Sequence, residues 1–148
     1  MPSDAEMLEI ALDEARAGAE EGGIPIGAAL FVDGACVARG RNQRVQQGSQ
    51  ILHGEMSCLA NAGRRGDFHR AVLATTLSPC MMCSGTILQF AIPRVIIGEA
   101  ETFGGNEAFL RERGVALSIL NDPRCISLMR RFIEANPALW NEDIGVHD

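Results

Sequence analysis

The sequence predicts an α/β protein, a three-layer α/β/α sandwich with a central five-stranded mixed sheet. Helical and strand patterns alternate along the 148 residues after an initial helix and β-hairpin, an order typical of one sheet with helices on its faces. The nearly apolar run RVIIG (94–98) indicates a strand buried on both faces, and therefore a partly parallel sheet. A chain of this length is expected to form one domain, residues 1–148.

The first part of the chain predicts a helix, a hairpin and a second helix. Ser3 and Glu6 form a capping-box pattern, and apolar residues at helical spacing follow until Gly22-Gly23 ends the helix. IGAALFV and ACVARG are predicted strands, joined by Asp33-Gly34, a strong hairpin turn. After a glutamine-rich loop, the next helix is expected from His53 to about residue 61.

The remaining elements are separated by prolines and glycines. AVLATTL is a predicted strand, and Pro79 is placed in the first turn of a helix that runs to about Phe90. RVIIG and VALSIL are strands on either side of the short helix NEAFLRERG. Asp122 as N-cap and Pro123 at the first helical position open the last helix, which Pro137 ends. The tail ALWNEDIGVHD is assigned no element.

The charge balance argues against a nucleic-acid partner. The net charge is −6, and the basic residues are 13 scattered arginines with no lysine, whereas proteins that grip a phosphate backbone carry a basic patch. The apolar runs are too short to span a bilayer, and the acidic N-terminus is unlike a secretory signal. We therefore expect a cytoplasmic protein with a small neutral substrate, no membrane contact and no nucleic-acid partner.

Four residues predict a metal site that performs chemistry. The stretch SPCMMCSG contains Cys80 and Cys83, and HGE supplies His53 and Glu55. One nitrogen and two sulfurs make three zinc ligands, the number typical of a catalytic zinc that leaves a position open for water. Two cysteines three apart share one helical face, and the helix N-terminus favours thiolates. The order H-x-E and then P-C-x-x-C is typical of zinc deaminases, whose glutamate is not a ligand.

Other interpretations of the two cysteines remain open at this point. They fit a thioredoxin-like redox pair, although such a pair needs no His-x-Glu. A structural zinc would need a fourth protein ligand, and zinc could also serve only to stabilise a binding module. Iron would fit the same three ligands. The candidate fourth ligands, none with paired spacing, are Cys36, Cys58, His69 and His147.

The chemistry expected of such a site is hydrolytic deamination. Zinc lowers the pKa of bound water and yields a hydroxide, which attacks a ring carbon that carries an amino group. Glu55 would take the water proton and deliver it to the ring nitrogen and then to the leaving amine. His53 and Glu55 can share the site only if the first turn of their helix points into it.

Several stretches spread over nearly the whole chain resemble the zinc-dependent cytosine deaminases of the fungal type, within the cytidine deaminase-like superfamily. They are EEGGIPIGAAL, RNQR, LHGEMS, TTLSPCMMCSG, IPRVIIGE and LWNEDIG. The resemblance implies the cytidine deaminase-like fold, conversion of cytosine to uracil and ammonia, one Zn²⁺ per chain and a homodimer. The metal motif is common to the superfamily, whereas the tail LWNEDIG resembles the C-terminal lid of cytosine deaminase.

The resemblance also implies substrate contacts. In the family an asparagine before the histidine holds the ring, backbone groups contribute beside the metal ligands, two aromatic residues cover the ring, and a tail aspartate and isoleucine close over it. The corresponding residues here are Asn42, Gly54, Ser78, Phe103, Trp140, Asp143 and Ile144. Asp143 is expected to accept a hydrogen bond from the leaving amino group.

Three departures from the family pattern leave the exact substrate open. Met81 stands where a polar residue is expected, Cys58 replaces a small residue, and FGGNEAF is glycine-rich after Phe103. Alternative substrates are isocytosine, creatinine or a guanine-like purine. A tRNA adenosine deaminase is a further alternative, but those enzymes usually read His-Ala-Glu and carry a basic tail, whereas this chain has Gly54 and an acidic tail.

Overall fold

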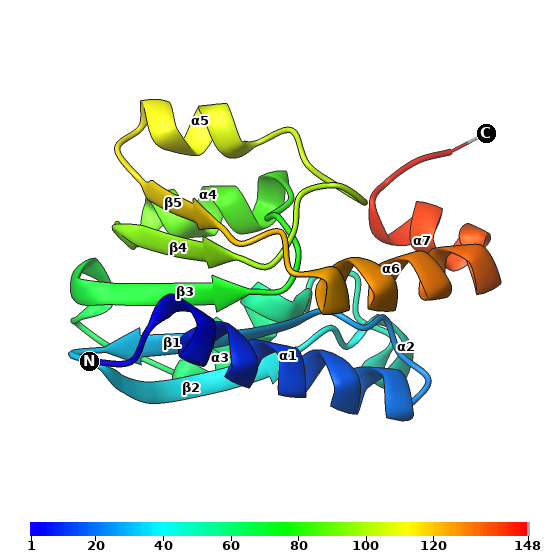
Figure 1. Ribbon diagram of the computed structural model, residues 1–148, viewed down its shortest axis with the longest axis horizontal. Helices are drawn as coiled ribbons and strands as arrows, with labels where there is room; N and C mark the ends of the chain where they lie inside the picture. Colours follow the sequence, from blue (N-terminus) through cyan, green and yellow to red (C-terminus); the bar gives the residue numbers. More distant parts are fainter. Residues whose placement is uncertain (148) are drawn as a thin grey trace.

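The computed structural model describes residues 1–147, and its centre is a five-stranded mixed sheet with the order β2-β1-β3-β4-β5 (Figure 1). The strand β1 pairs antiparallel with β2 and β3, while β3, β4 and β5 run parallel to one another. The prediction of a mixed, partly parallel sheet is therefore confirmed. The strands are β1 (Gly27–Val32), β2 (Ala35–Arg41), β3 (Ala71–Thr75), β4 (Arg94–Ile97) and β5 (Ala116–Ile119).

Helices cover both faces of the sheet, as the three-layer prediction requires. α1 (Asp4–Glu20) and α6 (Pro123–Ala135) lie on one face, in front of the sheet in Figure 1. α3 (Gly54–Ala62), α4 (Met81–Gln89) and α5 (Glu107–Glu112) contribute to the apolar core of the other face. Alternate residues of β1 serve the two cores, because successive side chains of a strand point to opposite faces.

The predicted turn and caps are present. Ser3 Oγ accepts from the Glu6 amide at 3.1 Å, and the Ser3 amide donates to Glu6 Oε1 at 3.2 Å, which completes the capping box of α1. Asp33 and Gly34 both have positive φ, 52° and 83°, as a type I′ hairpin turn requires. The Asp122 side chain caps α6, and Pro123 takes its first turn.

One predicted boundary is wrong, and the tail contains a helix that was not predicted. Pro79 is not in the first turn of α4: it precedes Cys80, which is the N-cap because its extended backbone and its sulfur fill that role. Pro137 does follow the end of α6, but it also opens a further helix, α7 (Pro137–Asp143), in the tail for which no element was predicted. A proline lacks the N–H that a first helical position leaves unused, so it can follow one helix and begin the next.

Two short elements were not predicted: α2 (Arg44–Gln47) and a 3₁₀ turn at Phe68–Arg70. None of the helices within residues 1–147 is long and apolar enough to cross a membrane.

A third apolar cluster lies at the sheet edge where β3 and β4 end and β1 begins. It joins Ile24 and Ile26 before β1, Leu77 after β3, Met129 of α6 and Trp140 of α7. This cluster packs α6 and α7 against the edge of the sheet at which α3 and α4 also begin. Parts of the chain that are distant in sequence therefore meet at this edge.

Candidate active site

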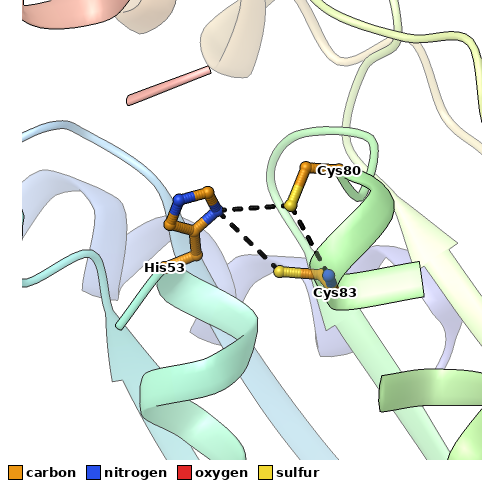
Figure 2. Close-up of side chains that lie close together, drawn as sticks. All are labelled: His53, Cys80 and Cys83. Atoms are coloured by element: carbon orange, nitrogen blue, oxygen red, sulfur yellow. Dashed lines mark hydrogen bonds between the residues drawn. The ribbon is translucent and has the colours of Figure 1, made fainter. Parts of the chain in front are cut away.

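His53, Cys80 and Cys83 lie together at the N-terminal ends of α3 and α4. The Nδ1 atom of His53 is 3.4 Å from Cys80 Sγ and 3.9 Å from Cys83 Sγ. Figure 2 shows the imidazole from the start of one helix facing both sulfurs from the start of the other. Within residues 1–147 these three residues form a group that could hold a metal ion, with all ligand atoms within 4.8 Å of one another.

The three residues fit zinc in both chemistry and spacing. Zinc accepts imidazole nitrogen and thiolate sulfur at bond lengths of about 2.0–2.3 Å, so two ligands of a tetrahedral ion lie about 3.6 Å apart. The observed separations of 3.4 and 3.9 Å bracket that value. The predicted metal ligands are therefore brought together by the fold.

The cap of α4 prepares the sulfur ligands. The Cys83 amide donates to Cys80 Sγ at 3.5 Å. Hydrogen bonding from Cys83 and, after it, from His53 lowers the pKa of the Cys80 thiol to about 4, although partial burial opposes this. A thiolate is the form that ligates a metal, so the local structure favours the ligand form of Cys80.

No fourth protein ligand joins the group within residues 1–147. Cys58 is fully buried in the apolar core under β1 and β3, and Cys36, His69 and His147 are exposed. The structural-zinc alternative therefore lacks the ligand that it needs, and three protein ligands are typical of a catalytic site.

Glu55 lies in the first turn of α3, two residues after His53, which is the N-cap. Glu55 is only 4% exposed, and its side chain lines the same cavity as His53. Burial raises the pKa of Glu55 to about 7, with a further contribution from the nearby Cys80 and opposition from His53. A carboxyl with a pKa near neutrality can both take up and release a proton, as a general acid–base requires.

A cavity beside the metal group contains most of the predicted site. It is lined by Ile26, His53, Glu55, Leu77, Ser78, Cys80, Phe103, Trp140, Asp143 and Ile144. Phe103 and Trp140 meet edge to face, with ring centroids 6.2 Å apart and planes at 89°. Together with Ile26 and Leu77 they make apolar walls suited to the faces of a flat ring.

Asn42 does not line the cavity, but it meets the cavity-lining Asp143 although 101 residues separate the two in the chain. Asn42 Nδ2 lies 3.4 Å from both carboxylate oxygens of Asp143, and both residues are buried. His53 Nε2 is 3.5 Å from Asp143 Oδ1. Asp143 therefore connects the tail to the loop before α3, through Asn42, and to the imidazole of His53, one of the three metal-ligand candidates.

The loop that carries Phe103 is held by two carboxylates. Glu99 is fully buried and accepts from the amides of Glu101 and Thr102 at 2.8 and 2.9 Å. Glu107 Oε2 accepts from Ser78 Oγ at 2.9 Å and from the amides of Gly105 and Asn106. These bonds fix the loop after β4 against the segment before Cys80.

Gly54 does not line the cavity, but it is buried and packs against the backbone of Ile26, where an added Cβ would approach the Ile26 oxygen to 3.0 Å.

Sequence reasoning missed Ile26, Leu77 and Arg44. Ile26 and Leu77 adjoin strand ends at one sheet edge, a signal that could have pointed to them. Arg44 pairs with Asp143; it ends the family-like stretch RNQR, which could have marked it, although no spacing pattern indicated its partner.

The comparisons with known proteins agree with this site. Residues 1–99 match the cytidine and deoxycytidylate deaminase zinc-binding region. The chain is 48% identical to cytosine deaminase of Candida albicans over 145 residues, 96% of this chain and 97% of that protein. It is 33% identical to the tRNA-specific adenosine deaminase of Bacillus subtilis over 108 residues, 71% and 67% of the two chains. The solved guanine deaminase from Nitrosomonas europaea has 21% identity and a TM-score of 0.76, over 89% and 85% of the chains.

A nitrogen–sulfur zinc site and a buried carboxyl beside a mixed sheet are thus the features of a zinc-dependent hydrolytic deaminase. The chain belongs to the cytidine and deoxycytidylate deaminase family, and the predicted resemblance to cytosine deaminases is confirmed. Family membership also sets aside the redox-pair and binding-module interpretations.

Proposed function

We propose that this protein hydrolyses cytosine to uracil and ammonia. The observation that carries the proposal is a cavity lined on one side by two of the metal-ligand residues and Glu55, and on the other by aromatic and tail residues. These are His53, Cys80 and Glu55, and Phe103, Trp140, Asp143 and Ile144. The 48% identity to a cytosine deaminase extends over almost the whole chain, including its C-terminal part. The cavity and this relative point to the same small ring.

Each polar group at the cavity suits one part of that ring. Asn42 Nδ2 is a donor and suits the ring carbonyl, whereas the Asp143 carboxylate is an acceptor and suits the amino group. Backbone groups of Gly54 and Ser78 stay predicted contacts at the ring edge. The aromatic pair Phe103 and Trp140, with Ile144, would cover the ring faces and exclude water.

The reaction needs one group that moves protons twice. When held by His53, Cys80 and Cys83, zinc supplies a Lewis acid that lowers the pKa of a water molecule. Glu55 accepts a proton as the water oxygen bonds to the ring carbon, and delivers it to the ring nitrogen. It then carries the second water proton to the amino group, so that the carbon–nitrogen bond breaks and ammonia leaves. Its pKa of about 7 suits both directions of transfer.

The alternative substrates differ in what they would demand of the cavity. Isocytosine reverses the positions of the amino group and the carbonyl, and a guanine-like purine needs room for a second ring. A tRNA adenosine deaminase needs a basic surface, whereas this chain has a net charge of −6 and α7 closes one side of the cavity. Cytosine fits these features best.

We also propose a homodimer in the cytoplasm, formed through the outer side of α4. That helix, MMCSGTILQ, has no charged residue, yet Met81 is 58% exposed and Gly85 and Gln89 are also exposed. An uncharged, partly apolar helix side is typical of a covered surface. Light scattering coupled to size-exclusion chromatography would report twice the mass of 15.9 kDa.

The proposed function is tested by ammonia release from the purified protein with its metal content measured. The substrates are cytosine, isocytosine, creatinine, guanine, adenine and cytidine, and Glu55→Gln is the control variant. We expect cytosine turnover far above the rest, and a loss of about 10²–10⁴-fold in Glu55→Gln with zinc and fold retained.

Other results would redirect the proposal. Turnover of a different ring would keep the mechanism and change the substrate, whereas full turnover by Glu55→Gln would remove the proton shuttle. If the zinc-loaded protein released no ammonia from any of the six compounds, the small-ring proposal would be contradicted and a macromolecular substrate favoured.

A further inference from the structure

Arg44, the first residue of α2, forms a shielded ion pair with the C-terminal helix. Its Nε donates to Asp143 Oδ1 at 2.6 Å, and the two side chains are only 10% and 2% exposed. Its Nη1 also lies 3.7 Å from Glu142 Oε2, but the Glu142 side chain is 62% exposed. The Asp143 contact is therefore expected to matter more than the Glu142 contact, because it is shielded from water. Removing one partner of such a buried pair leaves the other charge uncompensated.

This ion pair distinguishes the two oxygens of Asp143. Oδ1 receives the Arg44 guanidinium and lies near His53 Nε2 at 3.5 Å. Oδ2 has one long contact, 3.4 Å to Asn42 Nδ2. Arg44 thus fixes the rotation of the carboxylate and leaves Oδ2 as the oxygen that can accept from an amino group in the cavity.

The backbone of the same residue orients Asn42. The Arg44 amide donates to Asn42 Oδ1 at 2.9 Å, so the Nδ2 end of the carboxamide is turned toward Asp143. The Asn42 amide in turn donates to the Ile26 oxygen at 3.0 Å, and the residue is fully buried. One residue therefore sets the direction of the Asn42 donor and of the cavity-lining Asp143 acceptor that it meets.

The C-terminal helix depends on such a directional contact. α7 has seven residues, which is too short for a stable helix without tertiary contacts. Its other contacts are mainly apolar, through Trp140 and its neighbours, and apolar packing has little directional preference. The Arg44–Asp143 pair joins this helix by a short, directed bond to the loop that precedes the metal group.

We propose that Arg44 is a positioning residue that orders α7 over the cavity and fixes the donor–acceptor pattern presented to the substrate by Asn42 and Asp143. The part that concerns the substrate rests on the proposed function, whereas the ordering of α7 does not. Arg44 acts through Asp143 and Asn42 and is not assigned a contact with the reacting atoms.

The ordering of α7 can be measured without any substrate. Trp140 is the single tryptophan of the chain, lies in α7 and is 6% exposed. Its fluorescence therefore reports on this helix alone. We expect Arg44→Ala to shift the emission to longer wavelength and to raise the acrylamide quenching constant at least twofold, because the indole would then meet solvent.

Kinetics test the second part of the proposal on the zinc-loaded enzyme. We expect Arg44→Ala to raise the KM for cytosine about tenfold or more, with a smaller effect on kcat and no loss of zinc. Arg44→Lys should recover part of the KM, since an ammonium can still pair with Asp143. The control is Arg65→Ala, which removes a different arginine–aspartate ion pair, with Asp67 at 2.8–2.9 Å in the loop after α3, and neither residue lines the cavity. Its quenching and KM should equal those of the parent.

A double variant separates positioning from misfolding. In Arg44→Met with Asp143→Asn both charges are removed, so no buried charge is left unpaired. We expect Trp140 quenching to return toward the parent value, while the KM for cytosine stays high because the carboxylate acceptor is gone. This pattern would assign the effect of Arg44→Ala to the ion pair.

The proposal is overturned if Arg44→Ala leaves both Trp140 quenching and the KM unchanged, or if Arg65→Ala changes them equally. Quenching that rises in Arg44→Ala and not in Arg65→Ala supports the ordering of α7 even if the parent enzyme proves inactive on cytosine. That inactivity would count against the proposed function alone, so the two failures are distinguishable.

Discussion

The cavity has two sides that are built in different ways. On the metal side, His53, Glu55, Cys80 and Cys83 occupy the caps and first turns of two helices that pack on the sheet. On the tail side, Phe103 and Asp143 come from a loop and a short terminal helix, held by pairs between side chains far apart in sequence. The first side is set by local structure, and the second by long-range contacts.

From this difference we infer that the metal side carries the reaction and the tail side carries substrate selection. Each helix end places its own ligands by local geometry, and the packing of α3 and α4 on the same core brings the two ends together. We expect substrate recognition to depend on the loop after β4 and on α7, because both contribute residues that line the cavity. This fits the matches to two relatives whose names specify different substrates, cytosine and adenosine in tRNA.

Metal removal should have the largest effect, and it tests whether the two sides are independent. We expect a chelator to abolish turnover and added zinc to restore it, since the three ligands then have no ion to hold. Trp140 quenching should be unchanged, because Arg44 and the apolar cluster hold α7. Exposure of Trp140 on chelation would mean that the two sides are coupled.

Asp143→Ala should have the next largest effect, confined to the tail side. A charge-assisted hydrogen bond in a buried site contributes about 1.5–3 kcal/mol, so kcat/KM for cytosine should fall about ten- to hundredfold. Zinc content should not change, because Asp143 is outside the metal group. The neighbouring Glu142→Ala, with a 62% exposed side chain, is the matched control and should have little effect. Normal kinetics in Asp143→Ala would remove this residue from substrate binding.

Glu107→Ala should have a smaller effect that acts through the Phe103 loop. The change removes the acceptor of Ser78 Oγ and of two loop amides, at a cost of about 1–2 kcal/mol in unfolding free energy. We expect a lower Tm and a KM for cytosine that rises several-fold with kcat nearly constant. Glu112→Ala, at the exposed end of α5, serves as the control. A fall in kcat alone would contradict a positioning role.

The smallest effect is expected for an ion pair outside both sides of the cavity. Arg94 Nη2 donates to both Asp4 oxygens at 2.6 and 2.7 Å, and this hydrogen bond lowers the pKa of Asp4. A lowered carboxyl pKa stabilises the fold above the unfolded pKa of about 3.9, and the contribution is lost as the pH falls through the folded value. Asp4→Asn should therefore cost at most about 1 kcal/mol at pH 7, and almost nothing in strong acid.

Denaturant unfolding of Asp4→Asn and the parent at several pH values measures this difference. Activity should be unaffected at neutral pH. A loss of activity at neutral pH would show that a change at Asp4 affects the cavity through the sheet. The ion pair could then no longer be treated as independent of the site.

The metal side could be predicted from sequence because its signals are local. The spacing of Cys80 and Cys83 and the proximity of His53 to Glu55 follow from helix geometry, and the fold class followed from alternating patterns. The exact cap could not be predicted, since Pro79 suits a first helical position as well as the position before a cap. In the structure Pro79 takes the second of these positions, because the Cys80 sulfur accepts a hydrogen bond from the Cys83 amide and so makes Cys80 the N-cap.

The tail side could not be derived in this way. Asn42 and Asp143 are 101 residues apart, and only the resemblance to a family linked them. Arg44 lies among glutamines with no periodic pattern, so its partner is known only from the folded chain. Pro137 was interpreted as an end, whereas it also begins α7, and a seven-residue helix is stabilised by tertiary contacts that no local pattern records.

The location of α7 has a practical consequence for anyone who attaches a second protein or an affinity tag. Residues 145–147 directly follow the cavity-lining Asp143 and Ile144, whereas Met1 lies beside the β1–β2 turn at Gly34, at the other end of the molecule from α7 (Figure 1). We expect a fusion after residue 147 to bring its bulk close to the cavity-lining residues of the tail. A fusion at Met1, which is 99% exposed, would keep that bulk away from them.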